Sequence, residues 1–237
     1  MFENDNPKHR LIEALMGRAA EDPWREISLQ DIASAAGMSL ADARSHFSSR
    51  TDIMKAFVAL VDAEVLARAA EEGDPDDPAR DRLFDTLMTR FEVLAPFKPT
   101  LRMLRAGARR GDGPGLDLGR ALLEGQRWML EAAGIQTTGV SGSARVLATS
   151  AIYAQAFDTW LDDDDAGMAK TMAALDARLR RGEKAAERFK DVVSLFGGFA
   201  KAAFGGRRRG RGRDGATPED DTQSPSDRPG DPAAAPL

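Results

Sequence analysis

Residues 28–57 read SLQDIASAAGMSLADARSHFSSRTDIMKAF, and this stretch decides the fold. Three serines in it, Ser28, Ser39 and Ser49, each stand three residues before an aspartate. That spacing is typical of a helix start, because the serine oxygen accepts a hydrogen bond from a free backbone N–H of the first turn. Gly37 lies between the first two serines and suits the left-handed backbone with which helices commonly end. The stretch therefore predicts two short helices separated by a turn at Gly37, and a longer helix after Ser49.

The two short helices have the pattern of a helix-turn-helix, in which the first helix braces the second so that the second enters the major groove of DNA. Asp42 falls in the first turn of the second helix, where its carboxylate would face the phosphates of DNA. Its nearer task is to cap its own helix together with Ser39. A structural three-helix unit without DNA function is the alternative interpretation of this pattern.

The rest of the chain also predicts helices, because apolar residues recur at spacings of three and four and no alternating β-branched segment occurs. Asn6 and Pro7 mark the start of the first helix, and Gly134 follows the end of a later one. The segment SARVLATSAIYAQAFDTWL is apolar around most of its circumference, which predicts the most buried helix of the set. We therefore expect an all-α protein.

Composition divides the chain into four parts. A first helical domain occupies residues 1–70, and the acidic, proline-broken run EEGDPDDPARD separates it from a second helical domain at residues 78–183. Residues 184–204 predict an amphipathic helix. Residues 205–237 contain an Arg/Gly run and then an acidic, proline-rich segment, which together predict a disordered tail.

The composition excludes much enzyme chemistry. The chain has no cysteine and two histidines, so thiolate metal sites, cysteine nucleophiles and most histidine chemistry are ruled out. We expect no catalytic site, no metal and no cofactor. A net charge of −5 at pH 7 argues against a protein that coats nucleic acid, although a local basic face is compatible with it. Neither a signal peptide nor an apolar run of the ~20 residues that a membrane span needs is evident, so the cytoplasm is the expected location.

The segments SLQDIASAAGMS and HFSSRTDIMKAF resemble the DNA-binding domain of the TetR/AcrR family of bacterial transcriptional regulators. The resemblance covers roughly residues 11–66, and the helical remainder is similar in layout to that family's ligand-binding and dimerisation domain. It implies a TetR-like fold, a homodimer, operator DNA as partner, and a small effector that changes operator affinity by shifting the spacing of the two DNA-binding heads. The residues that it assigns to DNA binding are Ser39, Arg44, Ser45, His46, Arg50 and Lys55, with Arg50 at a phosphate.

The sequence departs from the family at the recognition helix. The family usually has a Gly-Thr pair and then an aromatic residue before its His-Phe, and here these places hold Ala41, Asp42 and Arg44. Arg44 is suited to a phosphate or a guanine, and His46 is expected to lock the end of its helix. Acids outnumber bases in residues 1–60, so we expect weak non-specific affinity for DNA.

The second domain carries large, soft side chains that pack a core and are expected in part to line an apolar effector pocket. A lipid, a quinone or another hydrophobic effector would suit such a pocket. The candidate pocket residues are Met88, Phe91, Met103, Trp128, Met129, Tyr153, Phe157 and Trp160.

A second resemblance leads to a different function. The segment ERFKDVVSLFGGFAKAAF, followed by RRRGRGR, is similar to the C-terminal amphipathic helix of the TetR-fold lipid-binding family of ubiquinone biosynthesis. This resemblance implies a lipid- or isoprenoid-binding accessory protein that has lost DNA binding and lies peripherally at the inner face of the membrane. A last helix packed on the core or across a dimer is the alternative for the same segment. The membrane-contact candidates are Phe189, Val192, Val193, Phe196 and Phe199.

Overall fold

The computed structural model describes residues 5–184. The predicted amphipathic helix after residue 184, the predicted tail at residues 205–237 and all five membrane-contact candidates, Phe189 to Phe199, lie outside the described residues. For these segments the expectations above stay predictions.

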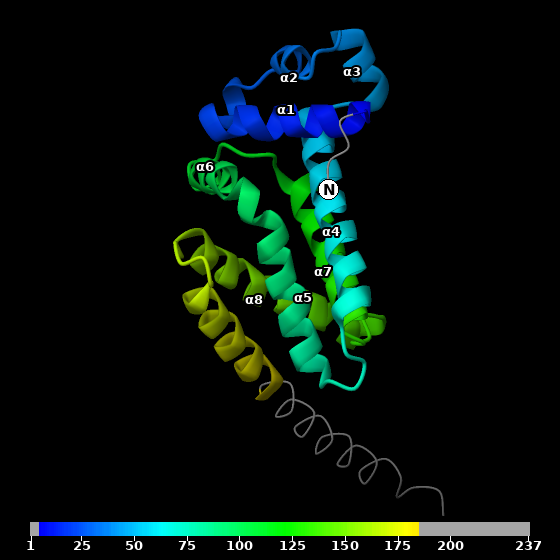
Figure 1. The fold of residues 1–237 in the computed structure, drawn as a ribbon, viewed down its shortest axis with the longest axis vertical. Coiled ribbons are helices and arrows are strands. Elements are labelled where there is room, and N and C mark those ends of the chain that lie inside the picture. Colours follow the sequence, from blue (N-terminus) through cyan, green and yellow to red (C-terminus); the bar gives the residue numbers. More distant parts are fainter. Residues whose placement is uncertain (1–4, 185–237) are drawn as a thin grey trace, which may run out of the picture. The chain divides into compact units, whose positions relative to one another are not determined.

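Within residues 5–184 the structure contains helices and no strand, which confirms the all-α fold (Figure 1). The N-terminal helices are α1 (Pro7–Glu21), α2 (Leu29–Ala35), α3 (Leu40–His46) and α4 (Arg50–Glu72). They are followed by α5 (Ala79–Leu94), α6 (Lys98–Ala108), α7 (Leu116–Ala132) and α8 (Gly139–Leu161). Short 3-10 turns lie at Trp24–Glu26 and Ala95–Phe97, and a last helix occupies residues 169–184 of the described chain.

The predicted helix starts are confirmed. The side chains of Ser28, Ser39 and Ser49 each accept a hydrogen bond from the backbone N–H three residues on, and Ser28 forms a full capping box with Asp31. Gly37 has a φ of +66°, and the hydrogen bonds from its own N–H and that of Met38 back into α2 close the helix end. Asn6 caps α1, with Pro7 in its first turn.

One continuous hydrophobic core runs through the described helices. The face of α1 that includes Leu11, Leu15 and Met16 is buried, and α1 lies between the α2–α3 pair and α6 (Figure 1). Helix α4 starts beside α1 and then packs along α5 and α7. The helix-turn-helix and helices α5–α8 are therefore connected by α4 and by the contact of α1 with α6.

Three hydrogen bonds cross between the N-terminal helices and the α6–α7 region. Thr100 Oγ1 on α6 donates to the Met16 carbonyl of α1 over 3.1 Å. The backbone N–H of Arg25 donates to Asp112 Oδ1 over 2.9 Å, and Thr51 Oγ1 donates to the carbonyl of Pro114 over 3.3 Å. Helix α6 and the loop after it are therefore bonded to the segments before and after the helix-turn-helix.

The expectation that α8 is the most buried helix is wrong for this chain. Val140 and Leu147 are 90% and 60% exposed, while Tyr153, Ala156 and Trp160 on the same helix are buried. The apolar circumference of α8 is thus divided between a face toward the core and a face that the described residues leave uncovered.

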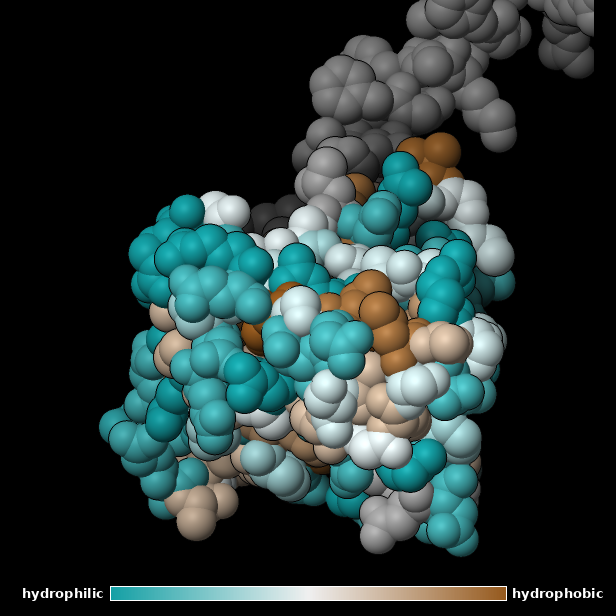
Figure 2. Space-filling model, turned by 90° about the horizontal axis from the view of Figure 1, so that it is seen from above, coloured by the Kyte–Doolittle hydropathy of each residue, from teal (hydrophilic) through white to brown (hydrophobic). Residues whose placement is uncertain are grey.

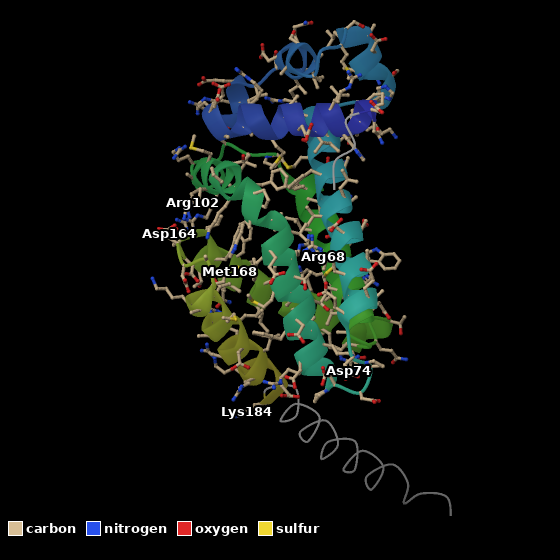
Figure 3. The ribbon with its side chains drawn as sticks, in the orientation of Figure 1. Arg68, Asp74, Arg102, Asp164, Met168 and Lys184 are labelled. Atoms are coloured by element: carbon tan, nitrogen blue, oxygen red, sulfur yellow. The ribbon has the colours of Figure 1, made fainter. Side chains whose placement is uncertain are left out.

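The four acids at residues 162–165, which follow α8, have separate partners in the structure. Asp164 pairs with Arg102 over 2.6 Å and Asp162 with Arg105 over 2.7 Å, so this loop is fastened to α6 (Figure 3). Asp163 is fully buried and accepts hydrogen bonds from the backbone and hydroxyl of Thr171. Among residues 5–184 no cluster of potential metal ligands occurs, and none of the helices there has the length and apolarity to cross a bilayer.

Candidate nucleic-acid interface

The second helix of the helix-turn-helix, α3, presents an exposed face. Only Ala43 of this helix is buried, and it packs toward α1 and α2, so the opposite side faces solvent. Figure 2 views the molecule from this end and shows hydrophilic side chains over most of the face, around a smaller hydrophobic patch. The exposed residues at the start and on the outer side of α3 are Ser39, Leu40, Ala41, Asp42, Arg44 and Ser45.

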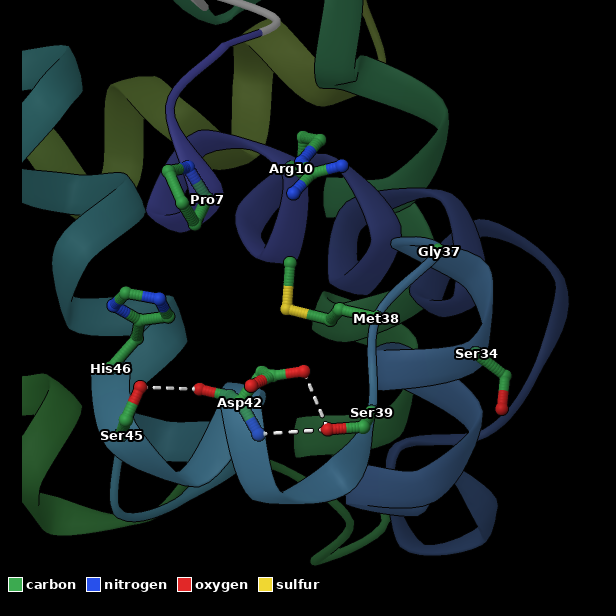
Figure 4. A pocket seen from close by; sticks show the side chains of 9 residues that line it. All are labelled: Pro7, Arg10, Ser34, Gly37, Met38, Ser39, Asp42, Ser45 and His46. Carbon is green, nitrogen blue, oxygen red and sulfur yellow. Dashed lines mark hydrogen bonds between the residues drawn. The ribbon is translucent and has the colours of Figure 1, made fainter.

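Asp42 makes its hydrogen bonds with residues at the start of α3 and within it. Ser39 Oγ donates to Asp42 Oδ2 over 2.6 Å, and the Asp42 backbone N–H donates to Ser39 Oγ over 3.1 Å (Figure 4). The Ser45 hydroxyl donates to the Asp42 carbonyl over 2.6 Å. The carboxylate therefore lies at the positive N-terminal end of α3, where the helix dipole stabilises it. Ser39 is thus confirmed as the N-cap of α3, and the Asp42 carboxylate supports it through the bond from the Ser39 hydroxyl.

A hollow of about 600 Å³ opens beside Asp42, between the start of α1, the turn and α3 (Figure 4). Arg10 on α1 and His46 at the end of α3 line it together with Met38 and Asp42. Within residues 5–184 neither Arg10 nor Arg44 takes part in an ion pair. Two uncommitted guanidinium groups therefore lie at this end of the molecule, one on α1 and one on α3.

Arg50 has a structural task at the start of α4. Its guanidinium Nη1 donates to the backbone carbonyls of Trp24 and Ile27, and its Cζ lies 5.1 Å from the centroid of the Trp24 ring. These contacts hold the loop between α1 and α2 against α4. The predicted phosphate contact of Arg50 stays a prediction, and its Nη1 is already engaged by the two carbonyls.

Lys55, the other basic candidate on α4, is paired within its own helix. Its Nζ lies 2.7 Å from Asp52 Oδ1, one turn earlier. This hydrogen bond raises the pKa of Lys55 and lowers that of Asp52, whose carboxylate also interacts with Ser49. The local charge of this turn is close to zero, so Lys55 adds little net attraction for phosphate.

The structure brings most of the candidate effector residues together. Phe91 of α5 stacks on Tyr153 and Trp160 of α8, with ring centroids 5.2 and 5.4 Å apart, and Phe157 lies 5.5 Å from Trp160. Met88 and Met129 are buried in the same core. The remaining two candidates, Met103 and Trp128, are 39% and 59% exposed, so they do not belong to an enclosed aromatic cluster.

A charged pair that was not predicted from the sequence lies next to this cluster. Arg90 of α5 and Asp62 of α4 are both buried and lie 2.7 Å apart, from Nη2 to Oδ1. A signal for Arg90 was present, because it stands three residues after Leu87 and four before Leu94, on the buried stripe of its helix.

Comparisons with known proteins agree with this architecture. No protein-family model matches the chain, and no curated protein matches it significantly in sequence. A TetR transcriptional regulator from Nitrosomonas europaea has a similar structure, with a TM-score of 0.59 and 21% identity over 75% of this chain and 98% of that one. The repressor AlkX from a Dietzia strain aligns with a TM-score of 0.49 and 16% identity over 77% of this chain and 98% of its own. The likeness to the Nitrosomonas europaea structure shows that the chain has the TetR fold.

Proposed function

We propose that the protein is a DNA-binding transcriptional regulator of the TetR type. The observation that carries the proposal is the exposed outer face of α3, on which Arg44 has no ion-pair partner within residues 5–184. A helix-turn-helix whose second helix is free on one side has the geometry to enter a major groove. The TetR fold supports this assignment.

In this proposal each part of the interface has its own task. Arg44 contacts a guanine edge or a phosphate, and the hydroxyls of Ser39 and Ser45, which donate to Asp42 in the free protein, turn to the DNA backbone near it. Arg50 and Trp24 fix the angle between α4 and the α1–α2 loop, which positions α3. Asp42 keeps the start of α3 helical, and its charge reduces affinity for phosphate in general.

The active species in this proposal is a homodimer, and the uncovered face of α8 is its interface. Val140 and Leu147 lie seven residues apart on α8 and are strongly exposed, and Ala144, Ala148 and Ala151 on the same helix are exposed as well. Apolar residues at this spacing form a stripe that a second copy of the helix covers. Two copies place two α3 helices on one duplex, as a two-fold operator requires.

The effector binds among helices α5 and α8, and its binding changes the position of α3. A ligand against Phe91, Tyr153 and Phe157 displaces α8, which is paired through Asp158 and Asp162 with Arg105 of α6. Helix α6 in turn holds α1 through the bond from Thr100 to Met16. The ligand changes operator affinity only if its own affinity differs between the two arrangements of these helices, and the size of that difference limits the change.

The test is a fluorescence-anisotropy titration of the full chain with the duplex upstream of its own gene, at two salt concentrations. Arg44→Ala should lower operator affinity by roughly one to two orders of magnitude, since a good contact to a base is worth about 1–3 kcal/mol. Arg127→Ala is the control, because Arg127 is an exposed arginine on α7, which is not one of the helices of the proposed DNA interface. Equal affinities of both variants, or flotation of the protein with anionic liposomes in place of DNA binding, would overturn the proposal.

A further inference from the structure

Three polar side chains meet inside the core, between α4, α5 and α8. Arg90 is 2% exposed, Asp62 8% and Tyr153 9%. Arg90 pairs with Asp62, and its Cζ lies 5.4 Å from the centroid of the Tyr153 ring. Burial raises the pKa of Tyr153 to about 12, so the phenol keeps its proton and acts as a hydrogen-bond donor.

This cluster has more donors than partners. Arg90 Nε and Nη1, the Tyr153 hydroxyl and the acceptor Asp62 Oδ1 are buried, and by geometry none of them makes a hydrogen bond within the described residues, although Arg90 lies close enough to Tyr153 to lower the pKa of its hydroxyl against the effect of burial. Buried donors are nearly always paired in native proteins, because leaving them unpaired forfeits the hydrogen bonds that water supplied. Arg90 and Tyr153 thus hold three buried donors beside a single carboxylate, so this cluster has donors to spare for a further acceptor.

The charge balance of the cluster restricts what that acceptor is. The Asp62 carboxylate already neutralises the Arg90 guanidinium, with 2.7 Å between Oδ1 and Nη2. A second anion would leave a net negative charge in a buried, weakly solvated place, which is strongly unfavourable. An uncharged acceptor such as a carbonyl oxygen satisfies the donors without that cost.

The surroundings define the rest of the ligand. The ring of Phe91 stacks on Tyr153 with 9° between the ring planes and on Trp160 with 26°. Phe157 lies 6.1 Å from Tyr153 and extends the same aromatic wall. A flat aromatic or conjugated body is complementary to these stacked rings.

We propose that Arg90 and Tyr153 bind the carbonyl oxygen of an uncharged, flat aromatic compound, of the aryl ketone, quinone or lactone class, inserted between α5 and α8. This inference rests on the proposed function, since it names the effector class of the same domain. Helix α8 packs on α5 over a much shorter stretch than α7 packs on α4, so α5 and α8 separate more readily to admit a ligand. The separation moves the α8 end that carries Asp158 and Asp162.

The test uses three naphthalenes of similar size: 2-acetylnaphthalene, 2-isopropylnaphthalene and 2-naphthoate. Binding to the full chain is measured by calorimetry without DNA. The ketone should bind at least tenfold more tightly than the hydrocarbon or the carboxylate. Tyr153 is the only tyrosine of the chain, so a ring ¹³C label gives one resonance, and the ketone should shift it.

Tyr153→Phe is the decisive variant, because it keeps the stacked ring and removes only the hydroxyl. It should abolish most of the preference for the ketone, leave the affinity for the hydrocarbon unchanged, and raise the melting temperature of the ligand-free protein. If the wild-type protein shows no preference for the ketone, or if the preference survives in Tyr153→Phe, the inference is wrong. If naphthoate binds most tightly, the conclusion that the ligand is uncharged is wrong. Since DNA is absent, a failure here leaves the operator titration, and the proposed regulator, untouched.

Discussion

Gly37 gives the sharpest test of the helix-turn-helix geometry. Its φ of +66° lies in the left-handed region, and a Cβ placed on it would meet no atom within 4 Å. The substitution Gly37→Ala therefore adds no clash, and its whole cost is the backbone energy of a left-handed alanine, about 1–2 kcal/mol. The lower conformational entropy of the unfolded alanine chain offsets part of this cost, so we expect a net destabilisation of about 1 kcal/mol.

Gly17 is the matched control, because it lies in the interior of α1 and a Cβ there would also meet no atom within 4 Å. Gly17→Ala should stabilise the protein by roughly 0.5–1 kcal/mol, since glycine costs that much in a helix interior. For a chain of this size, 1 kcal/mol corresponds to about 2–4 °C in melting temperature. The two variants should therefore move in opposite directions when thermal unfolding is followed by circular dichroism.

A third variant, Gly37→Asn, separates backbone conformation from side-chain volume. Asparagine tolerates the left-handed region, so this variant should melt between wild type and Gly37→Ala. If Gly37→Ala melts at or above the wild-type temperature, the turn does not have the conformation described, and the position of α3 relative to α2 needs another explanation.

Three further outcomes are expected. Asp42→Asn keeps the acceptor for Ser39 but removes the negative charge. Operator affinity should therefore rise several-fold at low salt, and this gain should fade as salt increases. A loss of affinity confined to operators with one particular cytosine would instead mean that the carboxylate contacts a base. The hydrogen bond from Arg105 lowers the pKa of Asp162 below its ordinary 3.8, so its stabilisation is present above that pH and disappears as pH falls. Arg105→Gln should accordingly lower the melting temperature near neutral pH, with a deficit that closes as the pH falls through and below 3.8, whereas curves that stay parallel would exclude this linkage. Leu147→Glu places a charge on the uncovered face of α8 and should yield monomers in light scattering with weakened operator binding, and an intact dimer would show that this face is not the interface.

Local features were predictable from the sequence. The helix starts at Ser28, Ser39 and Ser49 depend on groups three residues apart, so short-range chemistry determines them. The turn at Gly37 likewise needs only a residue that accepts a positive φ.

Features that depend on distant residues were not predictable in the same way. The carbonyl partners of Arg50 lie 26 and 23 residues earlier, and nothing in the spacing distinguishes an arginine that binds them from one that binds phosphate. The uncovered face of α8 escaped prediction because a helix that is apolar all round is buried either within its own chain or against another copy. The pairing of Asp62 with Arg90 required two helices to be placed side by side, which the sequence pattern of either helix alone does not do.

Helix α4 acts as a lever. It has 23 residues, which corresponds to a length of about 34 Å at 1.5 Å per residue. Its distal part packs among the helices of the second domain, and its first residue, Arg50, is fastened to the loop that positions α3. A tilt of only about 5° about the distal end displaces the other end by about 3 Å, which is close to the 3.4 Å between successive base pairs of DNA. In the proposed regulator, a small tilt of this helix in the core would therefore be large enough, at its far end, to take a side chain from one base pair to the next.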